Sequence, residues 1–255
     1  MKKIGIEVLA PPRQECASCP VRHRALFSPL LDERLGWAEK YRANQALVPA
    51  KHSLFLEGET AGHAYTLFEG WVAVYKTLAN GKRQITRFAL PGDFLGFQSD
   101  MDGPMSYAAV TITKCVLCAF PRTSMRTMFT EYPEVAAQMA SINARYMELC
   151  QYHLMGTGRQ SALERIAFLL LELFHRTRTQ AGFSDQGNGV PFPICQEEIA
   201  DAVGLTTVHV NRILKEMRER GLVECASRRL RITDEPALSE IAGFTEEFLQ
   251  SPAVL

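Results

Sequence analysis

Residues 196–220 of this 255-residue chain read QEEIADAVGLTTVHVNRILKEMRER. Apolar residues recur at helical spacing on both sides of Gly204, which predicts two short helices joined by a tight turn. Ala200 is small enough for two helices to cross closely, and glycine readily takes the positive φ that such a turn requires. Thr206 can cap the second helix through its hydroxyl. This spacing is typical of a helix-turn-helix, whose second helix lies in the DNA major groove.

The solvent face of the second predicted helix carries hydrogen-bonding and cationic side chains, which suit base edges and phosphates. We expect DNA contacts from Thr206, Thr207, Val208, His209, Asn211, Arg212 and Lys215. Arg212 is suited to a bidentate contact with guanine, and the methyl groups of Val208 favour thymine. His209 or Asn211 would add a backbone or adenine contact. The alternative is a helical hairpin that only packs in a protein core. Such a hairpin does not need Ala200, Gly204 and the apolar residues at these spacings all together.

Two alternating runs follow, Leu222–Glu224 and Leu230–Thr233, around a polar turn at Ser227–Arg229. They predict a β-hairpin wing. Seven Lys or Arg and three Glu lie between Thr206 and Arg231, whereas the whole chain has 28 basic and 28 acidic residues. The local positive excess predicts phosphate contacts here, with Arg229 as the contact from the wing.

The composition, 47% hydrophobic and 22% charged, is that of a soluble globular protein, and the length predicts two domains. Neither a membrane span nor a signal peptide is evident, so we expect a cytoplasmic protein without a membrane partner. Seven cysteines in such a chain indicate reduced thiols or metal ligands rather than disulfides. No nucleophile–base pair, phosphate loop or carboxylate constellation stands out, which argues against an enzyme.

Short alternating runs between residues 47 and 120 predict an antiparallel β-roll or barrel. Gly58, Gly70, Gly81 and Gly92 punctuate these runs every eleven or twelve residues. Asn80–Gly81 is the clearest hairpin turn among them.

A long helix is predicted next, because residues 133–155 contain neither glycine nor internal proline. Its apolar residues step by four and three, which is a heptad pattern, and they are expected to pack against a second copy of the helix. They are Val135, Met139, Ile142, Tyr146 and Leu149. Packing of one flank on the chain's own barrel is the alternative. Gly156–Thr157–Gly158 is expected to break the helix and to form a hinge.

Several motifs, in this order, resemble those of the CRP/FNR family of bacterial transcription regulators. They are Gly58–Glu59, the run from Leu67 to Tyr75, Pro91–Gly92–Asp93–Phe94–Leu95–Gly96, Ala162–Ala167 and the helix-turn-helix. The resemblance implies an α+β protein with an N-terminal antiparallel, cupin-like β-roll as sensor domain, a long dimerisation helix and a C-terminal winged helix-turn-helix. The expected boundaries are 1–27 for a cysteine-containing arm, 28–132 for the roll, 133–156 for the helix and 157–255 for the DNA-binding domain. The resemblance further implies a homodimer that binds a palindromic DNA operator and also contacts RNA polymerase.

The signal molecule, or effector, that the sensor domain binds is predicted from the positions at which this chain differs from other members of the family. Family members that bind cyclic nucleotides carry Glu and an Arg–Ser or Arg–Thr pair after the Pro–Gly–Asp motif, where this chain has Phe97–Gln98 and Met105–Ser106. No basic residue lies between Arg87 and Lys114, so a buried phosphate would lack a guanidinium partner. A cyclic nucleotide is therefore not expected, and an oxygen, redox or other small-molecule signal is. A cyclic-nucleotide or other small-effector regulator without an iron–sulfur cluster is the alternative.

Cysteine spacing resembles that of the FNR branch, which holds an iron–sulfur cluster. Cys16, Cys19 and Cys118 match three of the ligand positions, and the third N-terminal cysteine is missing. Cys115 and His23 are candidate substitutes, although strand residues three apart face opposite sides. An ancestral cluster site with purely structural thiols is the alternative. Cys195 stands at the expected N-cap of the first helix of the helix-turn-helix, called here the first reader helix. Its thiol is either an oxidation switch on DNA binding or simply a poor cap.

Overall fold

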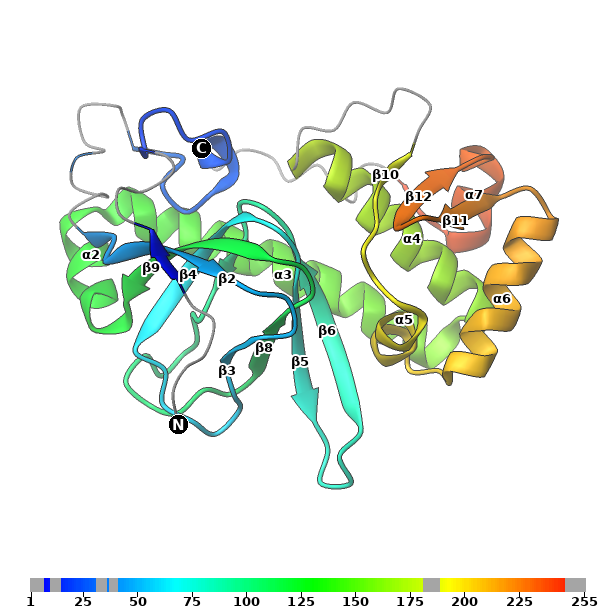
Figure 1. Cartoon of the computed structure of the whole chain (residues 1–255), viewed down its shortest axis with the longest axis horizontal. Helices are drawn as coiled ribbons and strands as arrows, with labels where there is room; N and C mark the ends of the chain where they lie inside the picture. Colours follow the sequence, from blue (N-terminus) through cyan, green and yellow to red (C-terminus); the bar gives the residue numbers. More distant parts are fainter. Residues whose placement is uncertain (1–6, 10–14, 31–35, 37–40, 181–188, 246–255) are drawn as a thin grey trace. The chain divides into compact units, whose positions relative to one another are not determined.

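The computed structural model describes residues 7–9, 15–30, 36, 41–180 and 189–245. They form two compact units (Figure 1). The first comprises the described residues up to Thr77 together with Arg87–Ala144, and the second comprises Leu78–Thr86 and the described residues from Arg145. None of the described helices is long and apolar enough to cross a membrane.

The first unit is an antiparallel β-roll made of two sheets, as the alternating runs predicted. One sheet has the strand order β1-β2-β9-β4-β7 and the other β3-β8-β5-β6. The strands are β1 (Glu7–Leu9), β2 (Asn44–Val48), β3 (Ser53–Phe55), β4 (His63–Glu69), β5 (Val72–Thr77), β6 (Arg83–Ala89), β7 (Phe94–Leu95), β8 (Ala108–Thr111) and β9 (Cys115–Pro121). Asn80–Gly81 lies in the turn between β5 and β6, where Gly81 has φ 80°.

Apolar side chains fill the space between the two sheets. Leu67, Val72, Leu95 and Leu117 are among the fully buried residues of this core. Gly70 connects β4 to β5 with φ 105°, and a Cβ there would lie 2.6 Å from the Sγ of Cys115. The close approach of two strands therefore requires glycine at this position.

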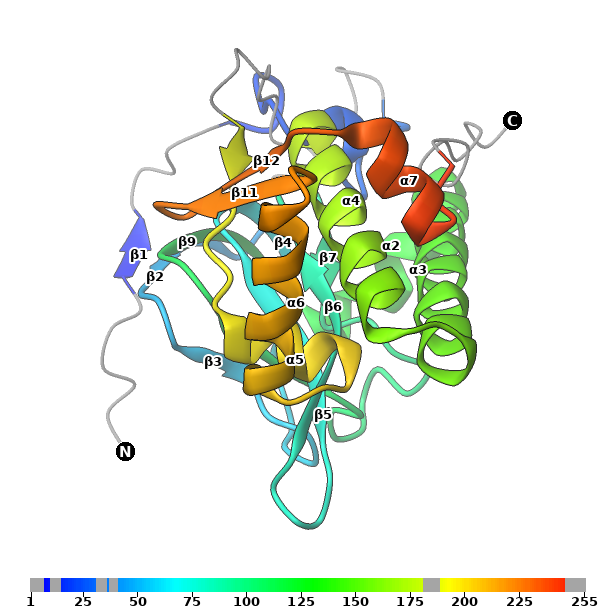
Figure 2. The ribbon, with the colours of Figure 1, turned by 90° about the vertical axis from the view of Figure 1, so that its right-hand side faces the viewer.

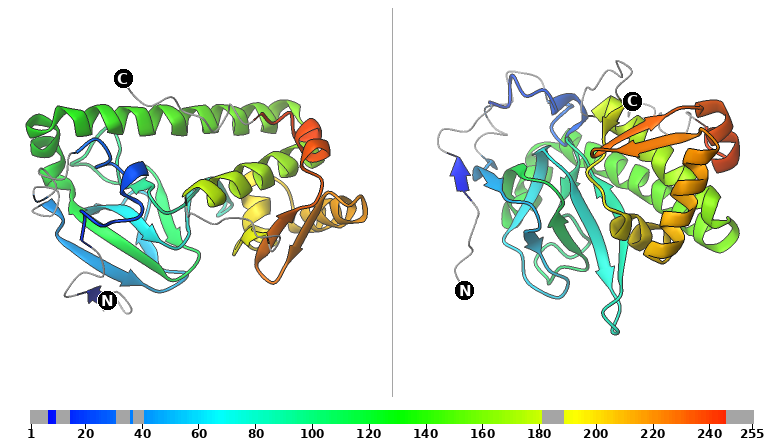
Figure 3. Two further views of the ribbon diagram at one scale, coloured as in Figure 1. Left: turned by 90° about the horizontal axis from the view of Figure 1, so that it is seen from above. Right: turned by 45° about the vertical axis from the view of Figure 1, so that its right-hand side comes forward.

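A short helical segment, η3 (Arg122–Ser124) with α2 (Met125–Glu131), leads into the long helix α3 (Pro133–Arg159). Figure 3 shows α3 as one continuous helix. The predicted break at Gly156–Thr157–Gly158 is therefore wrong. Two glycines each cost about 1 kcal/mol relative to alanine inside a helix, which packing can offset. The hydroxyl of Thr157 also donates to the carbonyl of His153 at 2.9 Å.

The helix ends instead at a capping box. Ser161 N donates to Glu164 Oε2 at 2.6 Å, and Glu164 N donates to Ser161 Oγ at 3.3 Å. These reciprocal bonds satisfy donors that the first turn of the next helix leaves free. Helix α4 consequently spans Ala162–Gln180.

The apolar stripe of α3 is buried inside the single chain. Val135, Met139, Ile142 and Leu149 are between 0% and 5% exposed, and Tyr146 is half-buried. The prediction assigned this stripe to a partner subunit. The burial of this stripe within one chain favours the alternative, in which the helix packs on its own chain.

The second unit is a winged helix-turn-helix domain (Figure 2). Its elements after α4 are β10 (Val190–Pro191), α5 (Gln196–Val203), α6 (Thr207–Glu219), β11 (Val223–Ala226), β12 (Arg229–Ile232) and α7 (Glu235–Ala242). The three strands form one sheet in the order β10-β12-β11. Ile166, Leu169, Leu170 and Leu173 of α4 are buried in its core.

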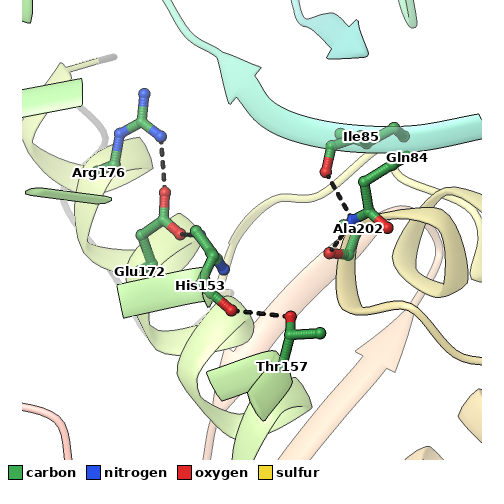
Figure 4. A network of polar contacts seen from close by, with 7 residues as sticks. All are labelled: Gln84, Ile85, His153, Thr157, Glu172, Arg176 and Ala202. Carbon is green, nitrogen blue, oxygen red and sulfur yellow. Dashed lines mark hydrogen bonds and ion pairs between the residues drawn. The ribbon is translucent and has the colours of Figure 1, made fainter. Parts of the chain in front are cut away.

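A buried ionic network joins the end of α3 to α4 (Figure 4). The carboxylate of Glu172, 2% exposed, accepts from His153 Nε2 at 2.9 Å and from Arg176 Nη1 at 2.8 Å. Burial alone would raise the pKa of this carboxyl. The hydrogen bonds and charges of His153 and Arg176 outweigh that effect and lower the pKa to about 2.

We predict that Glu172→Gln destabilises the protein by about 3–5 kcal/mol, because it leaves a buried guanidinium without its counter-charge. A carboxylate with a lowered pKa contributes stability that is fully present above its ordinary pKa and is lost as the pH falls through the folded value. The difference in unfolding free energy between the wild type and the variant should therefore be largest near neutral pH and shrink between about pH 4.5 and 2. Urea denaturation at several pH values measures it. The exposed Glu148→Gln is the control, and an equal loss in both variants would contradict the network's role.

Candidate functional site

The first reader helix, α5, is held at both ends. At its start, Cys195 N donates to the side chain of Glu198 at 2.7 Å. At its end, Gly204 adopts φ 68°, the left-handed conformation expected at the corner. Ala200 is buried, as a position that has room only for a small side chain would be. The predicted positive φ of Gly204 is confirmed.

The last carbonyls of α5 are bound by side chains from elsewhere in the second unit. Gln84 Nε2 donates to the carbonyl of Ala202 at 2.9 Å (Figure 4), and Arg165 Nη1 donates to that of Val203 at 2.9 Å. Arg83 also pairs with Asp201 at 2.7 Å. The last carbonyls of any helix lack partners within the helix, so the sequence predicts that the end of α5 needs hydrogen-bond donors. It does not predict that Gln84 and Arg165, which are distant in the chain, supply them.

The second reader helix, α6, is capped by Thr206, whose Oγ1 accepts from His209 N at 3.2 Å. Its inner face is buried through Val210, Ile213, Leu214 and Met217. The opposite face presents the predicted DNA-contacting residues to solvent. Thr206, Thr207, Val208, Asn211, Arg212 and Lys215 are exposed, and His209 is half-buried.

Val208 is 80% exposed, which is unusual for an apolar side chain at the start of a helix. A single exposed apolar residue needs no explanation in general. Here it lies among polar and cationic neighbours on the face that would enter a groove, where a thymine methyl is a suitable partner.

The wing is the hairpin of β11 and β12. Its turn is formed by Ser227 and Arg228, with φ 53° and 57°, and Arg229 begins β12. Arg229 Nη2 donates to the backbone carbonyl of Gly189, so this side chain has a partner within the domain. A guanidinium has five N–H donors, of which this bond uses one.

Three cysteines line one pocket in the first unit. Cys16 and Cys19 come from the N-terminal arm, and Cys118 comes from β9. The pocket encloses about 420 Å³ of open space, and its remaining lining residues are Val21, Arg22, Ala25, Phe27, Arg42, Thr66, Phe68 and Phe120. The tertiary fold thus brings together the three thiols that the sequence suggested.

Burial and a guanidinium act on these thiols in opposite directions. Burial raises the pKa of both Cys19 and Cys118, and the charge of Arg42 lowers it in part. Arg42 Nη1 also approaches Cys16 Sγ at 3.6 Å. The hydroxyl of Thr66, a residue 6% exposed, is buried in the same lining without a hydrogen-bond partner. The pocket therefore combines thiols with donors that suit an anionic group.

The candidate substitutes for the missing cysteine do not join this pocket. Cys115 lies in the core between the sheets, so its side chain faces away from that of Cys118, as strand geometry predicted. Burial there raises the pKa of Cys115 to about 11. His23 is exposed and does not line the pocket. Within the described part of the chain, no three Cys, His, Asp or Glu side chains are placed to hold a single metal ion.

Two arginines beside the β-roll core flank the segment without basic residues: Arg87 is half-buried and Arg122 is buried. Arg87 Nη2 donates to the carbonyl of Phe94 at 3.0 Å. Arg122, 3% exposed, donates to the carbonyls of Ala61, Asp100 and Gly103 at 3.1–3.4 Å. Both guanidinium groups thus have backbone acceptors, and their positions in flanking segments explain why a local motif search misses them.

Comparison with known proteins places both units in one family. The Crp-like helix-turn-helix domain matches residues 164–241, and the cyclic nucleotide-binding domain matches residues 46–132. The nitrogen fixation regulation protein FixK of Bradyrhizobium diazoefficiens is 28% identical over 241 residues, which cover 94% of this chain and 99% of FixK. The transcriptional activatory protein AadR of Rhodopseudomonas palustris is 31% identical over 193 residues, which cover 76% of this chain and 79% of AadR.

Solved structures agree with these matches. FixK2 from Bradyrhizobium japonicum aligns with a TM-score of 0.70 at 26% identity, covering 77% of this chain and 96% of FixK2. A CRP-family transcriptional regulator from Thermus thermophilus aligns with a TM-score of 0.63 at 30% identity, covering 78% of this chain and 96% of that one. With a β-roll, a long helix and a winged helix-turn-helix in family order, this chain belongs to the CRP/FNR family of DNA-binding, dimeric transcription regulators and is not an enzyme.

Proposed function

We propose that this regulator responds to oxygen or redox state through an iron–sulfur cluster bound by Cys16, Cys19 and Cys118, rather than to a cyclic nucleotide. The supporting observation is that three thiols from distant parts of the chain line a single pocket. Such a cluster, when bound, supplies a group whose stability and charge depend on oxidants. A bacterial DNA-binding regulator of this kind acts in the cytoplasm and, as an activator, contacts RNA polymerase.

The residues of the pocket suit an anionic thiolate-bound group. Arg42 and Arg22 would offset its negative charge, and Thr66 would donate to it from a hydroxyl that has no acceptor. Three thiolates leave one ligand position open, since no further Cys, His, Asp or Glu lines the described pocket. That position would take a ligand from solvent.

We predict that protein purified without oxygen shows a broad absorbance near about 400 nm and contains iron. Cys16→Ser, Cys19→Ser and Cys118→Ser should each abolish this absorbance, because each removes one of three thiolates. Cys150→Ser, on the exposed side of α3, should leave it unchanged. Colourless anaerobic protein that binds DNA normally would favour the alternative function, a small-effector regulator with structural thiols.

The subunits, we further propose, pair through the exposed face of α3 instead of its buried stripe. Exposed residues follow a second heptad pattern along this face, with steps of three and four: Ala137, Ala140, Ala144, Met147, Gln151, Leu154 and Gly158. Met147 and Leu154 are 62% and 73% exposed in the single chain. Three alanines in the first part of this face, and Met147 and Leu154 further along it, suit close packing of two such helices.

Replacing Met147 and Leu154 together by Glu should convert dimers to folded monomers, because carboxylates at a closely packed apolar interface lose their hydration. Analytical ultracentrifugation and circular dichroism measure both properties. Replacing the buried Ile142 and Leu149 by Glu is the contrasting pair and should instead unfold the chain. A dimer that survives the first double substitution would place the interface elsewhere.

Each operator half-site, in this proposal, is read by α6. Arg212 would bind guanine O6 and N7, Val208 would contact a thymine methyl, and Arg229 in the wing would bind a phosphate. Two such readers related by a dyad bind half-sites about one helical turn, roughly 34 Å, apart. The operator would therefore be a palindrome with an unread centre.

Arg212→Ala should weaken operator binding by about 1–3 kcal/mol and relax the preference for that guanine. Arg229→Ala should weaken binding to all sequences alike and reduce the salt dependence. Selection of operators from a random pool with the wild type and each variant measures both effects. Identical selected motifs from the wild type and Arg212→Ala would show that Arg212 does not read this base.

A further inference from the structure

The guanidinium of Arg212 has a specific partner on the reading face itself. Its Nη2 lies 2.9 Å from Nε2 of His209, one helical turn earlier on α6. Residues three apart on a helix are neighbours on one face, so the spacing allows this contact without distortion. The bond from His209 N to the Thr206 cap fixes the backbone from which the imidazole projects.

The chemistry of the two groups determines the direction of this bond. A guanidinium carries only donors and stays protonated, so Nε2 of His209 has to be the acceptor. The imidazole is then neutral with its proton on Nδ1. His209 consequently acts toward Arg212 as a neutral acceptor, and not as a second cation.

No carboxylate among the described residues performs this role. Glu216 pairs with Arg220 at 3.4 Å and Glu219 with Lys215 at 3.7 Å, one or two turns further along α6. Position 208, one turn before Arg212, holds a valine that cannot accept a hydrogen bond. The imidazole is thus the one acceptor that restrains this guanidinium in the described chain.

We propose that His209 is a positioning residue that holds Arg212 ready for guanine, and that it makes no independent base contact. A free arginine side chain loses much rotamer freedom on binding, and a contact already present in the unbound protein reduces that loss. The bond uses one of five N–H donors, so the others stay available for guanine O6 and N7. A neutral acceptor also competes less strongly with the base than a carboxylate would.

This inference rests on the proposed role of Arg212, and a double-mutant cycle tests it. The probes are the operator selected by the wild type, the same duplex with the assigned guanine pair replaced, and a random duplex of equal length. His209→Ala should reduce the preference for guanine about two- to tenfold, the range expected for one hydrogen bond. It should leave binding to the random duplex unchanged. In the Arg212→Ala background it should have no further effect on the preference.

Two further variants separate positioning from other roles. His209→Gln, whose amide oxygen is a neutral acceptor, should restore part of the preference. Glu240→Gln, at an exposed position of α7 outside the proposed reading face, is the control. A uniform loss of affinity on all three duplexes would show a phosphate contact instead. A changed preference that persists without Arg212 would show independent base reading, and either result overturns the inference. If Arg212→Ala itself leaves the guanine preference intact, the proposed reading role fails first.

Discussion

The long helix α3 buries one apolar stripe inside its own chain. This constraint determines which of its faces is left for a partner subunit. Val135, Met139 and Ile142 meet it by packing within the single chain. A helix face that is already covered is less available to a partner, and the pairing of subunits that we propose uses the face opposite to it. One heptad pattern thus anchors the helix, and a second, rotated pattern is left in solvent.

The reader depends on a different constraint, which is the pairing of backbone groups at the corner of the helix pair. Gly204 allows the sharp turn but has no side chain with which to satisfy the last carbonyls of α5. Gln84 and Arg165 donate to those carbonyls. The orientation of α5, and with it that of the packed helix α6, is therefore tied to side chains that lie outside the helix-turn-helix motif.

Prediction from the sequence succeeded wherever a short pattern has one steric solution. The spacing of Ala200, Gly204 and Thr206 allows a tight helical corner with a capped second helix, and that is what forms. The prediction at Gly156–Thr157–Gly158 was wrong because glycine only weakens a helix, and packing offset that loss. The Ser161–Glu164 capping box, a stronger local signal, marks the actual start of the next helix.

By itself, the sequence determined the α+β class, the order of roll, helix and reader, and the face of α6 that carries cations, because periodicity and turn chemistry are local properties. Only the tertiary structure decided which of two heptad faces on α3 is covered, since both patterns are compatible with a helix. It also decided that Cys16, Cys19 and Cys118 line one pocket while Cys115 lies in the core. The reason is that strand pairing across the roll, and not spacing along the chain, determines which distant side chains meet.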